Sequence, residues 1–123
     1  DWYLAGHSLG GVMASSFAAD QSDEVAGLIF LASYPSGDLT DAPFPVLSIY
    51  GSEDEVLNRE SYAEAQGKLP DDYTEIVLDG GNHGQFGDYG PQEGDGTASF
   101  SADQQQQQTI EAITAFIGNN RQQ

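Results

Sequence analysis

The chain has 123 residues, of which 38% are hydrophobic and none is cysteine. This length supports one modest domain with its own core but not two, so we expect a single domain over residues 1–123. The lack of cysteine excludes a disulfide framework, a thiolate metal site and a cysteine nucleophile. No run of the sequence approaches the roughly 18 apolar residues that a membrane helix requires, and no targeting signal is visible.

The charge balance is strongly acidic, with 20 Asp and Glu against three Lys and Arg and a formal net charge of −17. Nucleic-acid binding needs clustered basic residues, and the three here are far apart in sequence, so a nucleic-acid partner is excluded. Acidic surfaces of this density repel themselves in dilute buffer, whereas molar salt screens most of the repulsion. We therefore favour a salt-loving source and its cytoplasm as the location, with an acidic mesophilic protein as the alternative.

Four short apolar runs predict β-strands: Trp2–Ala5, Val25–Ala32, Val46–Tyr50 and Thr74–Leu78. The second run, VAGLIFLA, is almost continuously apolar, as expected of a strand that is buried on both faces of a parallel sheet. Helices are expected over residues 10–19 and 59–66 and at the C-terminal end. This alternation predicts an α/β fold: a doubly wound, mostly parallel sheet with flanking helices, forming the C-terminal part of a larger sheet.

The C-terminal helix has a recognisable start and apolar face. Ser101 and Gln104 match a capping box, and the predicted helix ends at Gly118. One face is expected to carry the four residues Ile110, Ile113, Phe116 and Ile117. The glutamine run 104–108 is expected to form the solvated first turns of this helix. Residues 80–96 hold seven glycines, too many for a helix or strand interior, and predict a structured loop.

The segment Gly6-His7-Ser8-Leu9-Gly10 matches G-x-S-x-G and stands between an apolar strand and a helix of small residues. This is the context of a nucleophile elbow, in which the serine occupies a strained turn and any larger residue at the flanking glycines would clash. We expect Ser8 to project from the C-terminal edge of the sheet. The amide of Leu9, at the N-terminus of the following helix, is the expected oxyanion donor.

A serine hydroxyl needs a base within hydrogen-bond reach and a third group that orients the base. The chain has two histidines, and His7 should point away from the nucleophile because neighbouring side chains on a turn diverge. His83 is therefore the expected base, on the loop after the fourth strand. The acid should follow the third strand, where Glu53, Asp54 and Glu55 compete, and the spacing from Gly51 favours Asp54.

The segments AGHSLGG, VLSIYGSEDEV and GGNHGQFGDYG resemble the α/β-hydrolase superfamily. They look most like its small-lid branch, known as carboxymethylenebutenolidase-like or dienelactone-hydrolase-like. The resemblance runs from Trp2 to about Phe116 and implies Ser8 as nucleophile, His83 as base and Asp54 as acid. Dienelactone hydrolases carry cysteine where Ser8 stands, so lactone specificity does not carry over.

The resemblance also implies that strands normally precede the elbow, and that a loop after one of them supplies the second oxyanion donor. Neither has a counterpart in this sequence. The strand Trp2–Ala5 would normally be central, so we expect its other edge to associate with another chain or with a missing N-terminal segment. We expect the 123 residues alone to be nearly inactive.

The expected reaction is hydrolysis of a small-molecule carboxylic ester through an acyl-enzyme, without a cofactor. The alternatives are an inactive hydrolase fold used for binding, and an acidic interaction module whose motif is coincidental. Only residues 33–44 separate the second and third strands, too few for a helical lid, so the pocket should be open. Weaker candidates for lining it are His7, Tyr34, Gln85 and Phe86, although Gln85, Phe86 and Tyr89 are better explained as anchors of the loop. No metal site is expected, because Asp88, Glu93 and Asp95 do not have the spacing of a calcium loop.

Overall fold

The computed structural model describes residues 2–87 and 92–121. Four strands form one sheet in the order β1-β2-β3-β4, and each neighbouring pair is parallel. The strands are β1 (Trp2–His7), β2 (Val25–Leu31), β3 (Val46–Gly51) and β4 (Tyr73–Leu78). All four lie within one or two residues of the predicted runs, and the predicted α/β fold is confirmed.

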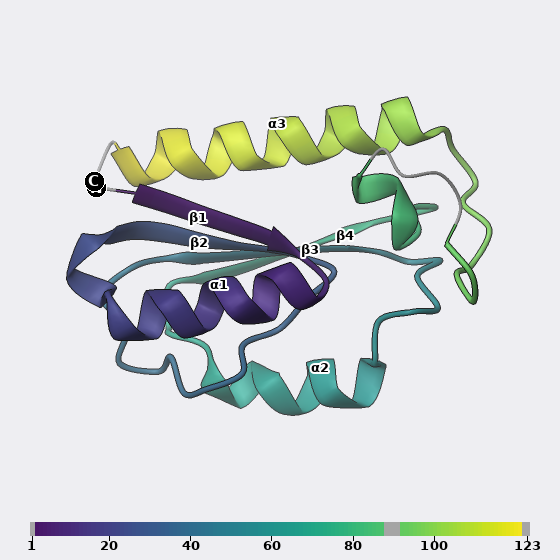
Figure 1. The fold of residues 1–123 in the computed structure, drawn as a ribbon. Helices are drawn as coiled ribbons and strands as arrows, with labels where there is room; N and C mark the ends of the chain where they lie inside the picture. Colours follow the sequence, from purple (N-terminus) through teal and green to yellow (C-terminus); the bar gives the residue numbers. More distant parts are fainter. Residues whose placement is uncertain (1, 88–91, 122–123) are drawn as a thin grey trace.

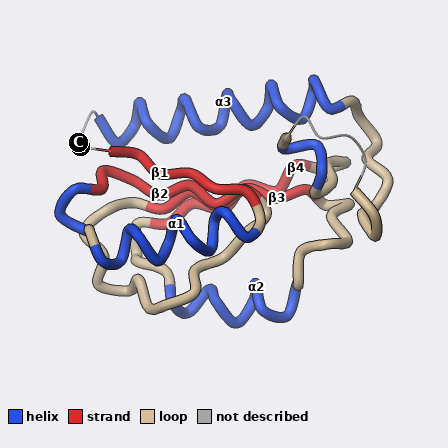
Figure 2. Tube along the Cα trace, viewed as in Figure 1, coloured by secondary structure: helices blue, strands red, loops and turns tan. Residues whose placement is uncertain are grey.

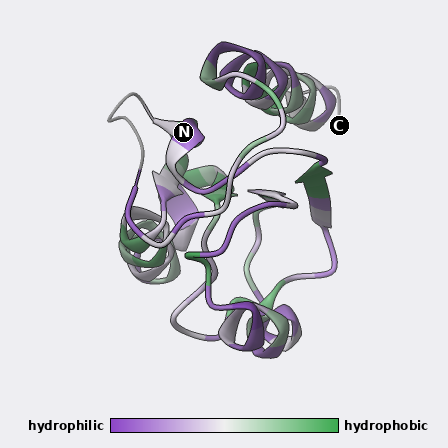
Figure 3. Cartoon of the chain, turned by 90° about the vertical axis from the view of Figure 1, so that its right-hand side faces the viewer, coloured by the Kyte–Doolittle hydropathy of each residue, from purple (hydrophilic) through white to green (hydrophobic). Residues whose placement is uncertain are grey.

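Within the described residues, three α-helices cover the sheet: α1 (Leu9–Asp20), α2 (Arg59–Ala65) and α3 (Ala102–Arg121). Figures 1 and 2 show α1 and α2 on one face of the sheet and α3 on the other. Figure 3, turned by 90°, shows the sheet between α3 and the other two helices. Within the described residues, no helix is both long and apolar enough to cross a membrane.

The core has one apolar layer on each face of the sheet. Leu28, Phe30 and Val46 pack in the layer that includes Ala18 of α1. Ile29, between Leu28 and Phe30, packs in the opposite layer with Leu47, Ile49 and residues of α3. Successive side chains of a strand point to opposite faces, so a strand buried on both sides needs an unbroken apolar run. This explains the sequence VAGLIFLA.

β1 lies at one edge of the sheet. β1 pairs with β2, and no other described strand pairs with it. Next to it, α1 exposes three large apolar side chains, Leu9, Met13 and Phe17, which are four residues apart and therefore share one face of the helix. Trp2 at the start of β1 is also exposed. Leu9, Met13 and Phe17 thus form an exposed apolar stripe along α1.

The capping box at the start of α3 is confirmed, because Ser101 and Gln104 exchange backbone-to-side-chain hydrogen bonds. The predicted apolar face is wrong at Ile110, which is 57% exposed. The buried stripe runs instead through Gln105, Thr109, Ile113 and Phe116. The solvated interpretation of the glutamine run is likewise wrong for Gln105, which is 0% exposed. The helix also continues past Gly118 to Arg121.

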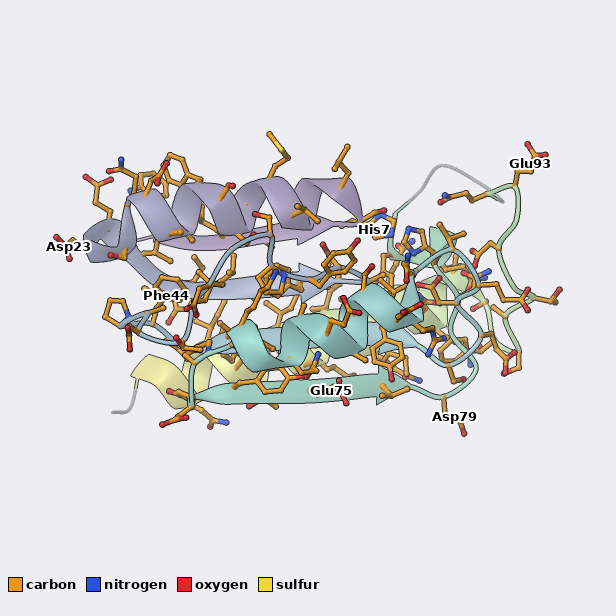
Figure 4. The ribbon with its side chains drawn as sticks, turned by 90° about the horizontal axis from the view of Figure 1, so that it is seen from below. His7, Asp23, Phe44, Glu75, Asp79 and Glu93 are labelled. Carbon is orange, nitrogen blue, oxygen red and sulfur yellow. The ribbon has the colours of Figure 1, made fainter. Side chains whose placement is uncertain are left out.

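In a parallel sheet, all strands end at the same edge. Figure 4 places His7, at the end of β1, and Asp79, just after β4, at one end of the molecule. Asp23 and Phe44, which precede β2 and β3, lie at the other end. The loops that carry Ser8, Asp54 and His83 follow β1, β3 and β4, so they meet at the carboxyl edge, where α/β proteins bind their ligands.

Candidate active site

Ser8 occupies a strained turn between β1 and α1. Its φ of 58° and ψ of −125° form a conformation that residues with a side chain rarely adopt. The turn brings strand and helix together: a Cβ on Gly6 would lie 2.4 Å from the backbone of Gly10, and one on Gly11 would lie 2.5 Å from Ser33. A Cβ on Gly10 itself would meet no described atom within 4 Å. The clash predicted at Gly6 is therefore confirmed, the clash predicted at Gly10 is wrong, and Gly11 makes a close approach that the sequence did not predict.

Hydrogen bonds on both sides hold the turn. The Ser8 amide donates to the Leu31 carbonyl over 3.0 Å, and the Ser33 hydroxyl donates to the Ser8 carbonyl over 2.6 Å. Leu9 begins α1, and the first amides of a helix have no acceptor inside it. Since the helix dipole also favours negative charge there, the Leu9 amide suits an oxyanion next to Ser8.

Asp54 lies in the turn between β3 and α2 and is 3% exposed, whereas Glu53 and Glu55 on either side of it are exposed. One carboxylate oxygen, Oδ1, accepts the amides of Val56 and Leu57, each over 2.8 Å. The other, Oδ2, lies 2.8 Å from Nδ1 of His83. Burial opposes the ionised form of Asp54, but the hydrogen bond from His83 and the two amides outweigh it and lower its pKa.

His83 is 1% exposed and lies on the loop after β4. Its Nδ1 shares the hydrogen bond with Asp54, so in the neutral ring Nδ1 carries the proton and Nε2 is the free base. Nε2 is buried and has no hydrogen-bond partner among the described residues. The ring is thus oriented by Asp54 and offers one acceptor nitrogen.

The loops that carry Asp54 and His83 are joined backbone to backbone. Glu53 donates its amide to the Gly81 carbonyl over 2.8 Å, and a Cβ on Gly51 would lie 2.3 Å from Gly81. Gly96 approaches the Glu53 carbonyl so closely that no side chain fits there. Close approach of this kind requires glycine, which gives several glycines of these loops a structural role.

Ser8 and His83 line the same cavity of about 220 Å³. Its other walls come from the start of α1, the residues after β2 and the loop before α2: Leu9, Val12, Ala32, Ser33, Tyr34, Val56, Leu57 and Asn58. A cavity of about 280 Å³ lies at the opposite edge of the sheet, between the starts of β3 and β4 and the end of α3. Ser8, Asp54 and His83 are not among its lining residues, so the smaller cavity is the one that contains predicted site residues.

The weaker predicted residues take different places. Tyr34 lines the cavity with Ser8, whereas His7, Gln85 and Phe86 are not among its lining residues. The His7 ring lies 4.6 Å from the His83 ring and 5.6 Å from that of Phe86, measured between centroids. His7 therefore packs on the predicted base, and Phe86 joins the core layer under α3. Tyr89 lies outside the described residues.

Three residues make polar contacts around the site that have no counterpart in the sequence-based prediction. The Asp95 carboxylate, considered above for calcium, accepts the amides of His83, Gly84 and Gly96. Gln105 bonds the backbone of Asn82, next to the predicted base. Arg59 donates to the Asp54 carbonyl over 2.8 Å. The described residues contain no group of three or more His, Asp and Glu side chains placed to hold a metal ion, and Asp88 lies outside them.

In this parallel sheet, a strained serine joins the first described strand to a helix, and a histidine–aspartate pair follows the last two strands. This combination defines an α/β hydrolase. The chain belongs to the Alpha/beta hydrolase family, whose model matches residues 1–107. A search of curated protein sequences gives no significant match.

Solved structures of hydrolases share the fold. Est1E from Butyrivibrio proteoclasticus aligns over 100% of this chain and 62% of its own, with a TM-score of 0.69 and 16% identity. A Paleococcus ferrophilus monoacylglycerol lipase aligns over 72% of this chain and 62% of its own, with a TM-score of 0.57 and 15% identity. An alpha-beta serine hydrolase homologue from Coxiella burnetii aligns over 66% and 40%, with a TM-score of 0.52 and 30% identity. The chain thus spans 40% to 62% of these structures.

Proposed function

We propose that this chain carries the nucleophile, base and acid of a serine hydrolase that cleaves carboxylic esters. The observation that carries the proposal is the pair formed by His83 and Asp54. Asp54 holds Nδ1 at 2.8 Å, and Nε2 has no hydrogen-bond partner among the described residues, beside the cavity that Ser8 also lines. An oriented imidazole with a free Nε2 can take the proton of the Ser8 hydroxyl once the two atoms come within hydrogen-bond reach, and the described structure shows no hydrogen bond between them.

The reaction follows from these positions. Ser8 Oγ attacks the ester carbonyl carbon while His83 Nε2 takes the hydroxyl proton, and the Asp54 carboxylate stabilises the imidazolium that forms. The Leu9 amide donates to the oxyanion of the tetrahedral intermediate. His83 then gives its proton to the leaving alcohol, and an acyl group remains on Ser8. Water, deprotonated by His83, attacks this acyl group; the bond to Ser8 Oγ breaks, His83 returns the proton to Oγ, and the carboxylic acid is released.

The choice of esters rests on the shape and neighbours of the site. The connection between β2 and β3 is short and holds no helix that could cover Ser8. The cavity walls include apolar side chains such as Val12, Val56 and Leu57, which suit an acyl chain or an alkyl alcohol. Among the proteins of similar fold are a monoacylglycerol lipase and the esterase RhEst1. Within the family we assign the chain to the dienelactone-hydrolase-like branch, with serine as nucleophile.

A second oxyanion donor would complete the site, and we assign it to a segment that docks beside β1, at the edge where no described strand pairs with it. The exposed Trp2 and the apolar face of α1 support this proposal, because a segment docked on β1 would cover them. Removal of one oxyanion donor costs roughly 10²- to 10³-fold in turnover. The isolated chain should therefore turn over esters far more slowly than a form in which that segment is supplied.

A fluorophosphonate probe tests the proposal, because it phosphonylates only serines that have an active base beside them. Mass spectrometry of the labelled protein should find the adduct on Ser8, and Ser8→Ala should remove both the label and the hydrolysis of p-nitrophenyl acetate. Ser101→Ala is the matched control, since this serine caps α3 and lies outside the cavity. An unlabelled Ser8 in a folded protein would favour the inactive binding module instead.

A further inference from the structure

The segment Asn82–His83 is held by side chains from three other parts of the chain. Asn82 donates its amide to Gln105 Oε1 over 3.1 Å, and its carbonyl accepts from Gln105 Nε2 over 2.8 Å. His83 donates its amide to Asp95 Oδ1 over 3.1 Å, and its carbonyl accepts from His7 Nε2 over 2.8 Å. All four backbone polar groups of the two residues therefore have a side-chain partner. Their geometry depends on those side chains instead of on a strand or helix.

Gln105 makes two of these four bonds with a single side chain. It is fully buried, on α3 at 0% exposure, where an unpaired amide would be costly. Two contacts fix its position. The Thr109 hydroxyl donates to the backbone carbonyl of Gln105, and a Cβ on Gly81 would lie 3.0 Å from the side-chain oxygen Oε1. The primary amide of glutamine carries a donor nitrogen and an acceptor oxygen side by side, so one group can bond both the N–H and the C=O of a single residue. It thus matches the backbone of one residue on both sides.

We propose that Gln105 is a positioning residue for His83. Through Asn82 it fixes the backbone that presents the imidazole, so that Nδ1 stays on Asp54 and Nε2 stays on the side of the cavity. The proposal rests on the proposed function, in which His83 is the base. Gln105 gives a rigid partner to the loop around His83, whose glycines would otherwise leave its backbone conformation free. Displacement of a reacting group by about 1 Å can cost on the order of 10²-fold in rate.

The neighbouring glutamines do not share this role. Gln104 caps α3 through Ser101, and Gln106 donates to the carbonyls of Gln85 and Gly87, beyond the predicted base. Gln107 bonds Glu111 on the same helix. Gln108 is exposed. The run therefore contains one buried residue that bonds the His83 loop on both sides, and it also provides a matched exposed control.

Gln105→Glu separates a positioning role from a purely structural one. A protonated glutamic acid accepts from the Asn82 amide and donates to its carbonyl, as glutamine does, whereas the ionised form can only accept and puts a charge against that carbonyl. Burial raises the pKa of such a carboxyl above its ordinary value of about 4.3. The variant should therefore match the wild type where the carboxyl is protonated and lose roughly 10- to 100-fold in kcat where it is ionised, with little change in KM.

The measurement is the ratio of variant to wild-type kcat across pH, with p-nitrophenyl acetate as substrate and activity counted per serine that a fluorophosphonate titrates. We expect the ratio for Gln105→Glu to fall with rising pH through a single ionisation. Gln108→Glu makes the same charge change on the exposed side of α3, and its ratio should stay flat. A flat ratio near one for Gln105→Glu would overturn the proposal, as would a lower count of titrated sites with an unchanged kcat per site.

Gln105→Met provides a second variant if Gln105→Glu does not fold. It is of similar length but makes neither bond, so its kcat per titrated site should be low at every pH, and a wild-type value would contradict the positioning role. Ser8→Ala separates the two hypotheses. Hydrolysis that survives Ser8→Ala would contradict the proposed function and this role with it. Loss in Ser8→Ala together with normal behaviour of both Gln105 variants would contradict the role of Gln105 alone.

Discussion

Replacing Asp54 by asparagine tests how the acid controls the base, because the substitution changes one hydrogen bond out of three. The amide oxygen can keep the bonds from Val56 and Leu57 at the position of Oδ1. The amide nitrogen then takes the position of Oδ2, 2.8 Å from Nδ1 of His83. Two donors cannot face each other, so the neutral imidazole must move its proton to Nε2. That nitrogen can then no longer take the proton of Ser8.

The expected loss in kcat/KM for Asp54→Asn is roughly 10²- to 10⁴-fold, and smaller than for Ser8→Ala. The cost in stability should be no more than about 3 kcal/mol, the value of one hydrogen bond to a charged group. Because folding lowers the pKa of Asp54, the carboxylate contributes its full stability above its ordinary pKa of 3.8 and loses it as pH falls through the lowered value. The difference in Tm between wild type and Asp54→Asn should therefore shrink in strong acid.

The assay is hydrolysis of p-nitrophenyl acetate per titrated serine, with Glu55→Gln as the control. Glu55 is exposed and adjacent in sequence, and its replacement should leave kcat/KM within about two-fold of wild type, as expected for a surface position. Wild-type activity in a folded Asp54→Asn variant would refute the orientation of His83 by Asp54. A loss in Glu55→Gln as large as in Asp54→Asn would contradict the assignment of the acid to Asp54.

Three further predictions concern the elbow, the surface charge and His7. Gly11→Ala should lower the free energy of unfolding by about 1–3 kcal/mol, because its Cβ would lie 2.5 Å from Ser33. Gly10→Ala should be neutral or stabilising in thermal unfolding, and equal costs for the two variants would contradict this account of the turn. The Tm should rise from dilute buffer to molar KCl as the net charge of −17 is screened, and a flat or falling Tm would contradict the proposed salt-loving origin. Burial and the nearby His83 lower the pKa of His7 below its ordinary value of 6.5. The neutral His7 side chain therefore contributes its full stability above pH 6.5 and loses it as pH falls from 6.5 through the lowered pKa. The Tm of the wild type relative to that of His7→Gln should thus fall on acidification below about pH 6.5, and a constant difference would contradict a neutral, half-buried His7.

The elements that the sequence predicts well are those whose pattern is local. The apolar run around Leu28 and Ile29 predicts a strand covered on both faces, since each alternate residue belongs to a different core layer. The elbow is equally readable, because the motif requires a strand, a strained serine and a helix in immediate succession. The preference for Asp54 over its acidic neighbours rests on spacing and resemblance, and the structure adds that Asp54 alone of the three is buried.

The contacts that the sequence does not predict join residues far apart in the chain. Gln105 lies in a run of five glutamines, and no local signal marks the one that faces Asn82, 23 residues earlier. The register of α3 explains the error at Ile110 as well. The helix turns its buried stripe through Gln105 and Thr109, which places Ile110 on the outer side. At the elbow, the position of Ser33 under Gly11 depends on how β2 ends, which the motif does not encode.

The most direct test of the central claim is a double-mutant cycle between Ser8 and His83. If the two act as one unit, Ser8→Ala and His83→Ala should each lower kcat for p-nitrophenyl acetate by about 10³-fold or more, and the double variant should lose no more than either single variant. Near-wild-type turnover in His83→Ala, or losses that multiply in the double variant, would show that the serine and the histidine do not act together.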